Sequence, residues 1–131
     1  MRNFFVPYEL AIKLQEKGFD DDCICSYNKS GKLCSKVSYS SGNDCECKWG
    51  KDDASDLRAP LYQQIIDWLR IKHDISLEME SGWSWIDGKR ITEYVCWVVY
   101  DRGNEEDEDA YYFNDYYEAL IDGIEDTLEL I

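Results

Sequence analysis

Apolar positions follow a helical period in two long segments of the chain. After Ala59-Pro60 they recur at i, i+4, i+7 and i+8, which predicts a helix there. Its apolar side chains are Leu61, Ile65, Trp68 and Leu69. A second stripe follows Asp115-x-x-Glu118, a start that resembles a capping box, and predicts a helix over 115–131. Its apolar side chains are Tyr117, Leu120, Ile121, Ile124, Leu128 and Ile131.

A shorter helix is predicted over 8–17. Pro7 suits a first helical turn, and Gly18 can adopt the left-handed conformation that ends a helix. Phe19 then falls where a Schellman closure places an apolar contact with Leu14. Both ends of this helix therefore have a signal in the sequence.

Strand-like patterns occupy much of the remaining chain. Between the first two helices, the β-compatible runs 23–27, 33–38 and 45–49 are separated by segments rich in turn-forming residues. We expect two or three antiparallel strands there.

Further strands are predicted after the middle helix. Over 75–80 apolar and polar residues alternate, as in a strand with one buried face. The runs 83–86 and 90–100 then flank Asp87-Gly88, the two-residue signal of a type I′ β-hairpin.

Together these elements predict an α+β fold. Their order is approximately α-β-β-(β)-α-β-β-β-α, with three helices against one face of an antiparallel sheet. With 131 residues, 44% of them hydrophobic and 15% aromatic, the chain can bury a core, and one domain spanning 1–131 is expected.

The same apolar pattern bears on the compartment. No apolar run approaches the roughly 20 residues of a membrane helix, and the run 4–6 is too short for a secretory signal. A soluble cytoplasmic protein is therefore expected, and its six cysteines are expected to be thiols.

Charge is distributed unevenly along the chain. Against 14 Lys and Arg there are 28 Asp and Glu, and the net charge of -14 argues against direct binding of nucleic acid. Residues 101–131 alone hold 12 acidic and one basic side chain. One group is a run of consecutive carboxylates, Glu105, Glu106, Asp107, Glu108 and Asp109. The other recurs at i, i+4, i+7 and i+11 of the last predicted helix: Glu118, Asp122, Glu125 and Glu129.

Two interpretations of this acidity compete. Like charges at i, i+4 repel by about 0.2–0.5 kcal/mol per pair, so helix stability alone does not favour the row. It can be a solvated face that maintains solubility. Alternatively, its carboxylates imitate a nucleic-acid backbone and steer the protein into the basic groove of a nucleic-acid enzyme.

The cysteines suggest a possible metal site. Cys23 with Cys25, and Cys45 with Cys47, form two Cys-x-Cys pairs. They would make a four-thiolate zinc site if the strands that carry them were neighbours. A single residue between the cysteines is shorter than the usual spacing in structural zinc sites, so buried thiols are the alternative.

No catalytic residue is predicted, and the chain is not expected to be an enzyme. His73 is the only histidine, and neither a nucleophile elbow nor a phosphate-binding loop occurs. The aromatic residues of the second half are expected in the core and in cross-strand pairs, and any that is exposed beside the acidic loop would anchor a partner. They are Trp83, Trp85, Tyr94, Trp97, Tyr100, Tyr111, Tyr112 and Phe113.

Three stretches of the chain, 8–20, 59–70 and 116–120, resemble a family of small uncharacterised proteins encoded by phages and mobile elements of anaerobic gut bacteria. The family has no established activity, so the resemblance transfers no catalytic residue. Its genetic context implies an accessory role in conflict between phage and host. The doubled Cys-x-Cys pairs and the acidic run at 105–109 depart from the family pattern.

The charge segregation and the resemblance together predict a phage or mobile-element accessory protein of anti-CRISPR type. It would bind and inhibit a host protein with a basic nucleic-acid groove, such as a CRISPR effector or another defence nuclease. Carboxylates of 105–109 and 118–129 would steer the encounter, and exposed aromatic residues would supply affinity. The alternative is a small zinc-binding adaptor built on the Cys-x-Cys pairs. Neither a membrane nor a cofactor other than zinc is expected.

Overall fold

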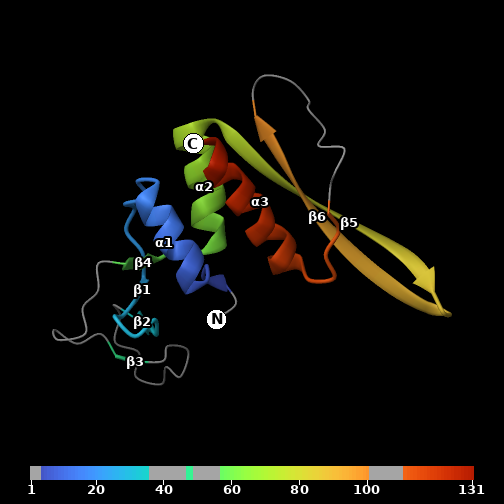
Figure 1. Cartoon of the computed structure of the whole chain (residues 1–131), viewed down its shortest axis with the longest axis horizontal. Coiled ribbons are helices and arrows are strands. Elements are labelled where there is room, and N and C mark those ends of the chain that lie inside the picture. Colours follow the sequence, from blue (N-terminus) through green and yellow to red (C-terminus); the bar gives the residue numbers. More distant parts are fainter. Residues whose placement is uncertain (1–3, 36–46, 49–56, 101–110) are drawn as a thin grey trace. The chain divides into compact units, whose positions relative to one another are not determined.

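A computed structural model describes residues 4–35, 47–48, 57–100 and 111–131 (Figure 1). Within these residues the element order is α-β-β-β-β-α-β-β-α, so the predicted α+β class is confirmed. The chain divides into two compact units, 1–65 and 66–131. Their boundary lies inside the second helix, and the expectation of a single domain stays a prediction.

The first unit begins with helix α1 (Tyr8–Glu16), which lies against strand β4 (Leu57–Ala59). The helix ends as the sequence predicts. Gly18 has a φ of 92°, its N–H donates to the carbonyl of Gln15 at 3.1 Å, and the N–H of Phe19 donates to the carbonyl of Leu14 at 3.0 Å. This pair of bonds is a Schellman closure, and the Leu14 and Phe19 side chains are buried.

The first unit also contains a four-stranded sheet. Its members are β1 (Cys25–Tyr27), β2 (Leu33–Ser35), β3 (Cys47–Lys48) and β4, in the order β3-β2-β1-β4. Strand β1 is antiparallel to β2 and β4, whereas β3 is parallel to β2. The prediction was therefore wrong in two respects: one pair is parallel, and Ala59, which was assigned to the start of a helix, is the last residue of β4.

Helix α2 (Tyr62–His73) follows β4 directly. The N–H of Leu61 donates to the side-chain oxygen of Gln64 at 2.9 Å, which satisfies one of the donors at the helix start. Ile65, Trp68 and Leu69 are buried, as their spacing predicts. The helix ends at His73, and Asp74 after it has a positive φ of 56°.

The second unit is built on a long hairpin of strands β5 (Ile75–Ile86) and β6 (Lys89–Tyr100). Asp87 and Gly88 have φ values of 52° and 74°, the two positive values that a type I′ turn requires, so the predicted turn is confirmed. The segments expected as two strands, 75–80 and 83–86, are one strand. The hairpin forms a separate two-stranded sheet, which corrects the expectation of a single sheet.

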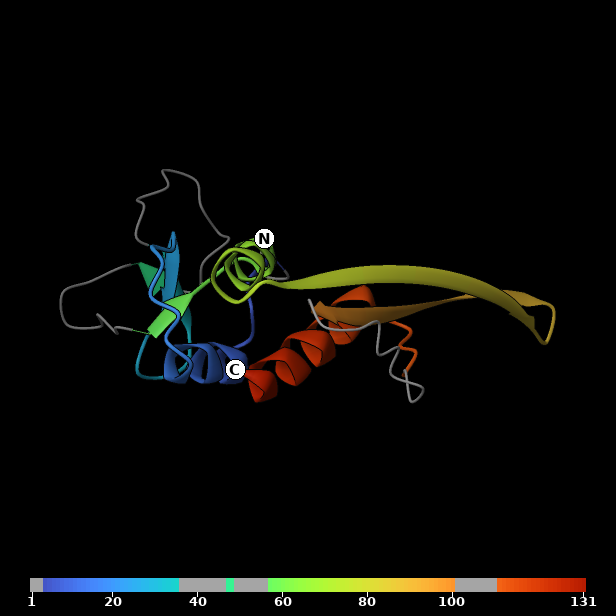
Figure 2. The same cartoon turned by 90° about the horizontal axis from the view of Figure 1, so that it is seen from above.

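Helix α3 (Tyr116–Leu130) packs against one face of this hairpin (Figures 1 and 2). The Asp115 carboxylate accepts hydrogen bonds from the N–H groups of Tyr117 and Glu118, at 2.8 and 3.0 Å, and caps the helix at the predicted residue. Its buried residues are Ala119, Leu120, Gly123, Ile124, Thr127 and Leu128. No helix within the described residues has the length and apolar character needed to cross a membrane.

Candidate functional site

Helix α3 carries five carboxylates and no basic residue. Four of them, which we name the acidic row, recur on one side of the helix: Glu118, Asp122, Glu125 and Glu129. The two end residues are exposed, whereas Asp122 and Glu125 are half-buried. The sequence predicted that the whole row lies on the outer face of the helix. This is wrong for the middle of the row, which is partly shielded from solvent.

The shielding has an electrostatic consequence at the contact between α3 and β6. Burial raises the pKa of the Asp122 carboxyl, and the negative charge of Glu125 raises it further. Burial raises the pKa of the Cys96 thiol to about 12, with the charges of Asp122 and Asp126 as smaller causes. Cys96 therefore stays protonated at neutral pH, which disfavours a role as a nucleophile.

Exposed tyrosines adjoin the start of α3. Tyr111, Tyr112 and Tyr116, which we name the tyrosine cluster, are 72%, 57% and 40% exposed. Phe113 holds this segment against β6 through two backbone hydrogen bonds with Tyr94, of 2.7 and 2.8 Å. The ring of Tyr94 also meets that of Tyr116 edge-on, with centroids 5.8 Å apart. The segment is thus held on β6 at the start of α3. Tyr116 lies two positions before Glu118, the first residue of the acidic row, so these two side chains do not share a face of the helix.

The far end of the hairpin carries a second exposed aromatic group. Trp83 and Trp85 are 58% and 65% exposed, and their rings meet edge-on with centroids 6.3 Å apart. The Arg90 guanidinium lies 5.0 Å from the Trp83 ring centroid, a cation–π contact. The prediction of a core position was therefore wrong for both tryptophans and for Tyr111 and Tyr112. The cross-strand packing also predicted is present where Arg90 of β6 lies on Trp83 of β5.

A comparison of element lengths could have indicated this exposure. A 12-residue strand extends about 40 Å, whereas a 15-residue helix extends about 22 Å. One helix of this length cannot cover the whole face of such a hairpin.

The strands β1 and β3, which carry Cys25 and Cys47 of the proposed zinc site, are not neighbours in the sheet. Cys25 lies in β1 and Cys47 in β3, and β2 runs between these strands. Cys23 precedes β1, and Cys45 lies outside the described residues. Within the described part of the chain, no three His, Cys, Asp or Glu side chains form a group that could hold a metal ion.

The state of the cysteines also differs from the prediction. Cys23, Cys25 and Cys96 carry thiols. Cys34 is disulfide-bonded, so the expectation that all six residues are thiols was wrong there.

Two further candidates from the sequence are the acidic run 105–109 and His73. The carboxylates of Glu105, Glu106, Asp107, Glu108 and Asp109 lie outside the described residues. His73 is half-buried at the end of α2, and its ring meets that of Trp68 edge-on with centroids 4.7 Å apart.

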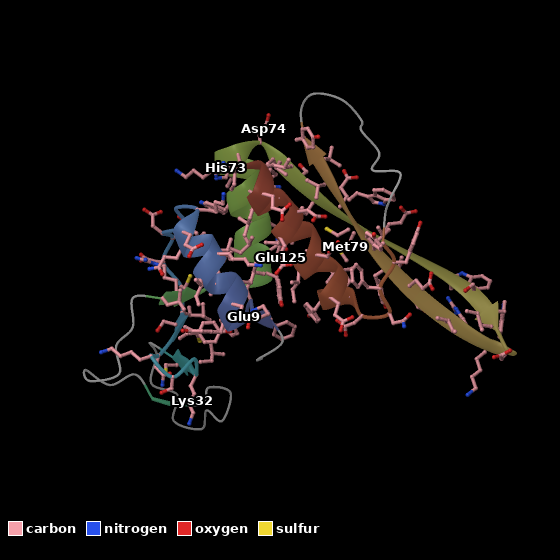
Figure 3. All side chains as sticks on the ribbon, viewed as in Figure 1. Glu9, Lys32, His73, Asp74, Met79 and Glu125 are labelled. Carbon is pink, nitrogen blue, oxygen red and sulfur yellow. The ribbon has the colours of Figure 1, made fainter. Side chains whose placement is uncertain are left out.

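The candidate site thus consists of the acidic row on α3 and the tyrosine cluster at the start of that helix (Figure 3 labels Glu125 of the row). Carboxylates can supply long-range attraction to a cationic surface, and exposed aromatic rings can supply contact area. In the comparisons with known proteins, no family model matches the chain, and no match is found among curated proteins or solved structures.

Proposed function

We propose that the chain is a non-enzymatic accessory protein that binds and inhibits a basic, nucleic-acid-binding protein inside a bacterial host cell. A CRISPR effector or another defence nuclease is the class of partner. The observation that carries the proposal is the acidic row, four carboxylates along a helix without a basic residue. The resemblance of three stretches to phage and mobile-element proteins supports the choice of partner.

The spacing of the row suits a groove that holds nucleic acid. Glu129 follows Glu118 by eleven positions, so the row extends about 16 Å, with one charge per roughly 5.5 Å. A nucleic-acid strand carries one charge per about 3.4 Å. The helix therefore presents a charge density of the same order, on a rigid support.

The row also lowers the stability of the helix that carries it. Glu118 and Asp122 are like charges at i, i+4, as are Glu125 and Glu129, and Asp122 is partly desolvated. Several carboxylates also lie near the negative end of the helix dipole. A pattern that opposes helix stability is expected where a partner supplies lysine and arginine side chains to offset the repulsion.

The tyrosine cluster supplies the affinity that charge alone does not. Tyrosine is enriched among residues that dominate binding energy, because its ring buries a large area with little loss of side-chain freedom. Tyr116 is exposed at the first residue of α3, and Tyr111 and Tyr112 are exposed in the segment that leads into the helix. A partner that extends from the acidic row past the start of α3 would reach these rings.

The test is an affinity pull-down of the tagged full chain from bacterial lysate, with identification by mass spectrometry. We expect a nucleic-acid enzyme that high salt and competitor DNA or RNA both displace. Recovery of partners that neither treatment displaces would contradict the proposal.

Kinetics with the recovered partner then test the row itself. Neutralising it by Glu118→Gln, Asp122→Asn, Glu125→Gln and Glu129→Gln should slow association about 10-fold or more at low salt and flatten its salt dependence. The matched control neutralises four exposed carboxylates of the first unit: Glu9→Gln, Glu16→Gln, Asp20→Asn and Asp21→Asn. Equal slowing in both variants would assign the effect to net charge and refute a role for the row.

A further inference from the structure

Strand β5 lies at the edge of its sheet in the part of the chain that the structure describes. Among the described residues its sheet partner is β6, whereas β6 is also bridged by Phe113 on its other side. The twelve residues of β5 pair with β6 in unbroken register, without a bulge. The strand contains neither proline nor lysine, two residues that commonly protect an edge strand from further pairing. In the described part of the chain, no other strand pairs with its outer backbone groups.

Only half of one hairpin face is covered by α3. The helix begins at Tyr116, whose ring lies on Tyr94, and Tyr94 pairs with Ser81 in the middle of β5. From there it runs toward the end of the hairpin that contains Leu77, whose side chain lies beside Gly123. The other half continues past the helix (Figures 1 and 2) and carries the exposed tryptophans on the same face.

We propose that two copies of this chain associate through β5, as antiparallel neighbours related by a two-fold axis at Ser81. The product is a continuous four-stranded sheet in the order β6-β5-β5-β6. In each copy, α3 covers the half of the hairpin that contains Leu77. These two halves lie at opposite ends of the four-stranded sheet, so the two helices together cover its face.

The sequence of β5 is self-complementary about this axis on its apolar face. Trp83 lies opposite Met79 of the second copy, where a thioether meets an aromatic ring. Trp85 lies opposite Leu77 of the second copy. Met79 (labelled in Figure 3) and Leu77 are half-buried in one copy, so both retain surface for the tryptophans to cover.

The two glutamates of β5 favour the same register, with the axis at Ser81. Glu80 lies opposite Gly82 of the second copy, and Glu78 lies opposite Ser84, so no carboxylate faces another. Moving the axis from Ser81 to residue 80 would set Glu80 against its own counterpart. Moving it to Gly82 would set Trp83 against Ser81 and lose an apolar pair.

The size of the interface is adequate for a dimer. Pairing over the length of β5 forms about 12 main-chain hydrogen bonds, the number of a typical protein interface. Trp83 and Trp85 of the two copies together expose roughly 500 Å². With the paired backbones added, the buried surface approaches the roughly 1,200 Å² of a specific interface. The strand that pairs with this edge is thus β5 of a second copy, because the side chains of β5 are complementary to those of another β5 in antiparallel orientation.

Molar mass in solution tests the proposal directly. Size-exclusion chromatography with light scattering, across a concentration series, should give twice the 15.4 kDa of one chain. Ser81→Lys sets two ammonium groups against each other on the axis and should give the mass of one chain. Thr92→Lys is the matched control, an exposed hydroxyl residue on the same face of the hairpin but on β6, and should remain a dimer. A wild-type mass of 15.4 kDa at every concentration, or a dimeric Ser81→Lys variant, would overturn the proposal.

A cross-link tests the register. Residues opposite each other in an antiparallel pair have Cα atoms about 4.5–5.5 Å apart, within the range of a disulfide. Mild oxidation of Ser81→Cys should therefore give a covalent dimer on a non-reducing gel, and Thr92→Cys should not. Equal cross-linking of the two variants would refute the axis at Ser81. The experiment requires no partner and alters no residue of the acidic row, so its outcome is independent of the proposed function.

Discussion

Gly123 lies where α3 meets the hairpin. A Cβ atom at this position would overlap the Sγ atom of Cys96 and lie 2.8 Å from its Cβ atom. Alanine is favoured over glycine in a helix interior by about 1 kcal/mol, so helix propensity does not explain the residue. Close approach of α3 to β6 explains it.

Gly123→Ala should accordingly lower the free energy of unfolding by about 1–3 kcal/mol, because the overlap exceeds the gain in helix propensity. Urea denaturation measures the change. Adding Cys96→Ala removes the Sγ atom and should restore part of the loss. Gly82→Ala is the control, since a Cβ atom there meets nothing within 4 Å. A Gly123→Ala variant as stable as the wild type would contradict the close contact.

Asp122 is expected to destabilise the native state at neutral pH. Its pKa is raised in the folded protein, so ionisation of the folded carboxyl is less favourable than ionisation of the unfolded one, whose pKa is near 3.8. This unfavourable contribution is full above the raised pKa. It declines as pH falls through that value and vanishes below the unfolded value.

Asp122→Asn should therefore raise the melting temperature at pH 7. The change removes the cost of burying the charged carboxyl and the repulsion with Glu125 at i+3. The repulsion alone contributes about 0.2–0.5 kcal/mol, or roughly 1–2 °C. Thermal unfolding at a series of pH values should show this gain shrinking as the solution is acidified toward the unfolded pKa. Asp20→Asn, an exposed carboxylate outside α3, serves as the reference. A gain that stays constant with pH would contradict the raised pKa.

At the scale of elements, local signals set the ends of α3 and of the hairpin. Asp115 accepts two hydrogen bonds from the first turn of α3, and the backbone of Asp87 and Gly88 has the two positive φ values of its turn type. These features involve residues within four positions of each other. Their energies therefore do not depend on distant packing, which is why the sequence predicts them correctly.

Asp115→Ala should lower the free energy of unfolding by about 1 kcal/mol, because two N–H groups lose their acceptor. Asp115→Asn retains a side-chain oxygen at the same place and should change stability by only a few tenths of a kcal/mol. Chemical denaturation of the two variants gives the comparison. Equal losses would indicate that charge, and not the capping geometry, is what Asp115 contributes.

The short strands of the first unit were not predictable in the same way. Strand β4 has three residues and β3 has two, too few to display a period of alternation. β4 is a strand because Leu57–Ala59 pairs with Tyr27–Cys25, 30 to 34 positions earlier in the chain. The parallel pairing of β3 with β2 likewise depends on the path of the chain and leaves no pattern in the sequence.

For the molecule as a whole, the two proposed surfaces occupy different sides of the hairpin. Phe113 holds the segment of the tyrosine cluster at the outer edge of β6, whereas the proposed dimer uses the outer edge of β5. A dimer can therefore present two acidic rows and two tyrosine clusters. Two such sites on one particle would raise the apparent affinity for a partner that can engage both.

The sequence by itself determined the α+β class, the three helices, the type I′ turn and the acidic row, because each follows from the spacing of nearby residues. Only the tertiary structure decided which of these residues meet water. The partial burial of Asp122 depends on the contact between α3 and β6 at Gly123. The exposure of Trp83 and Trp85 arises because a helix advances about 1.5 Å per residue and a strand about 3.3 Å, so the hairpin extends past the helix that covers it.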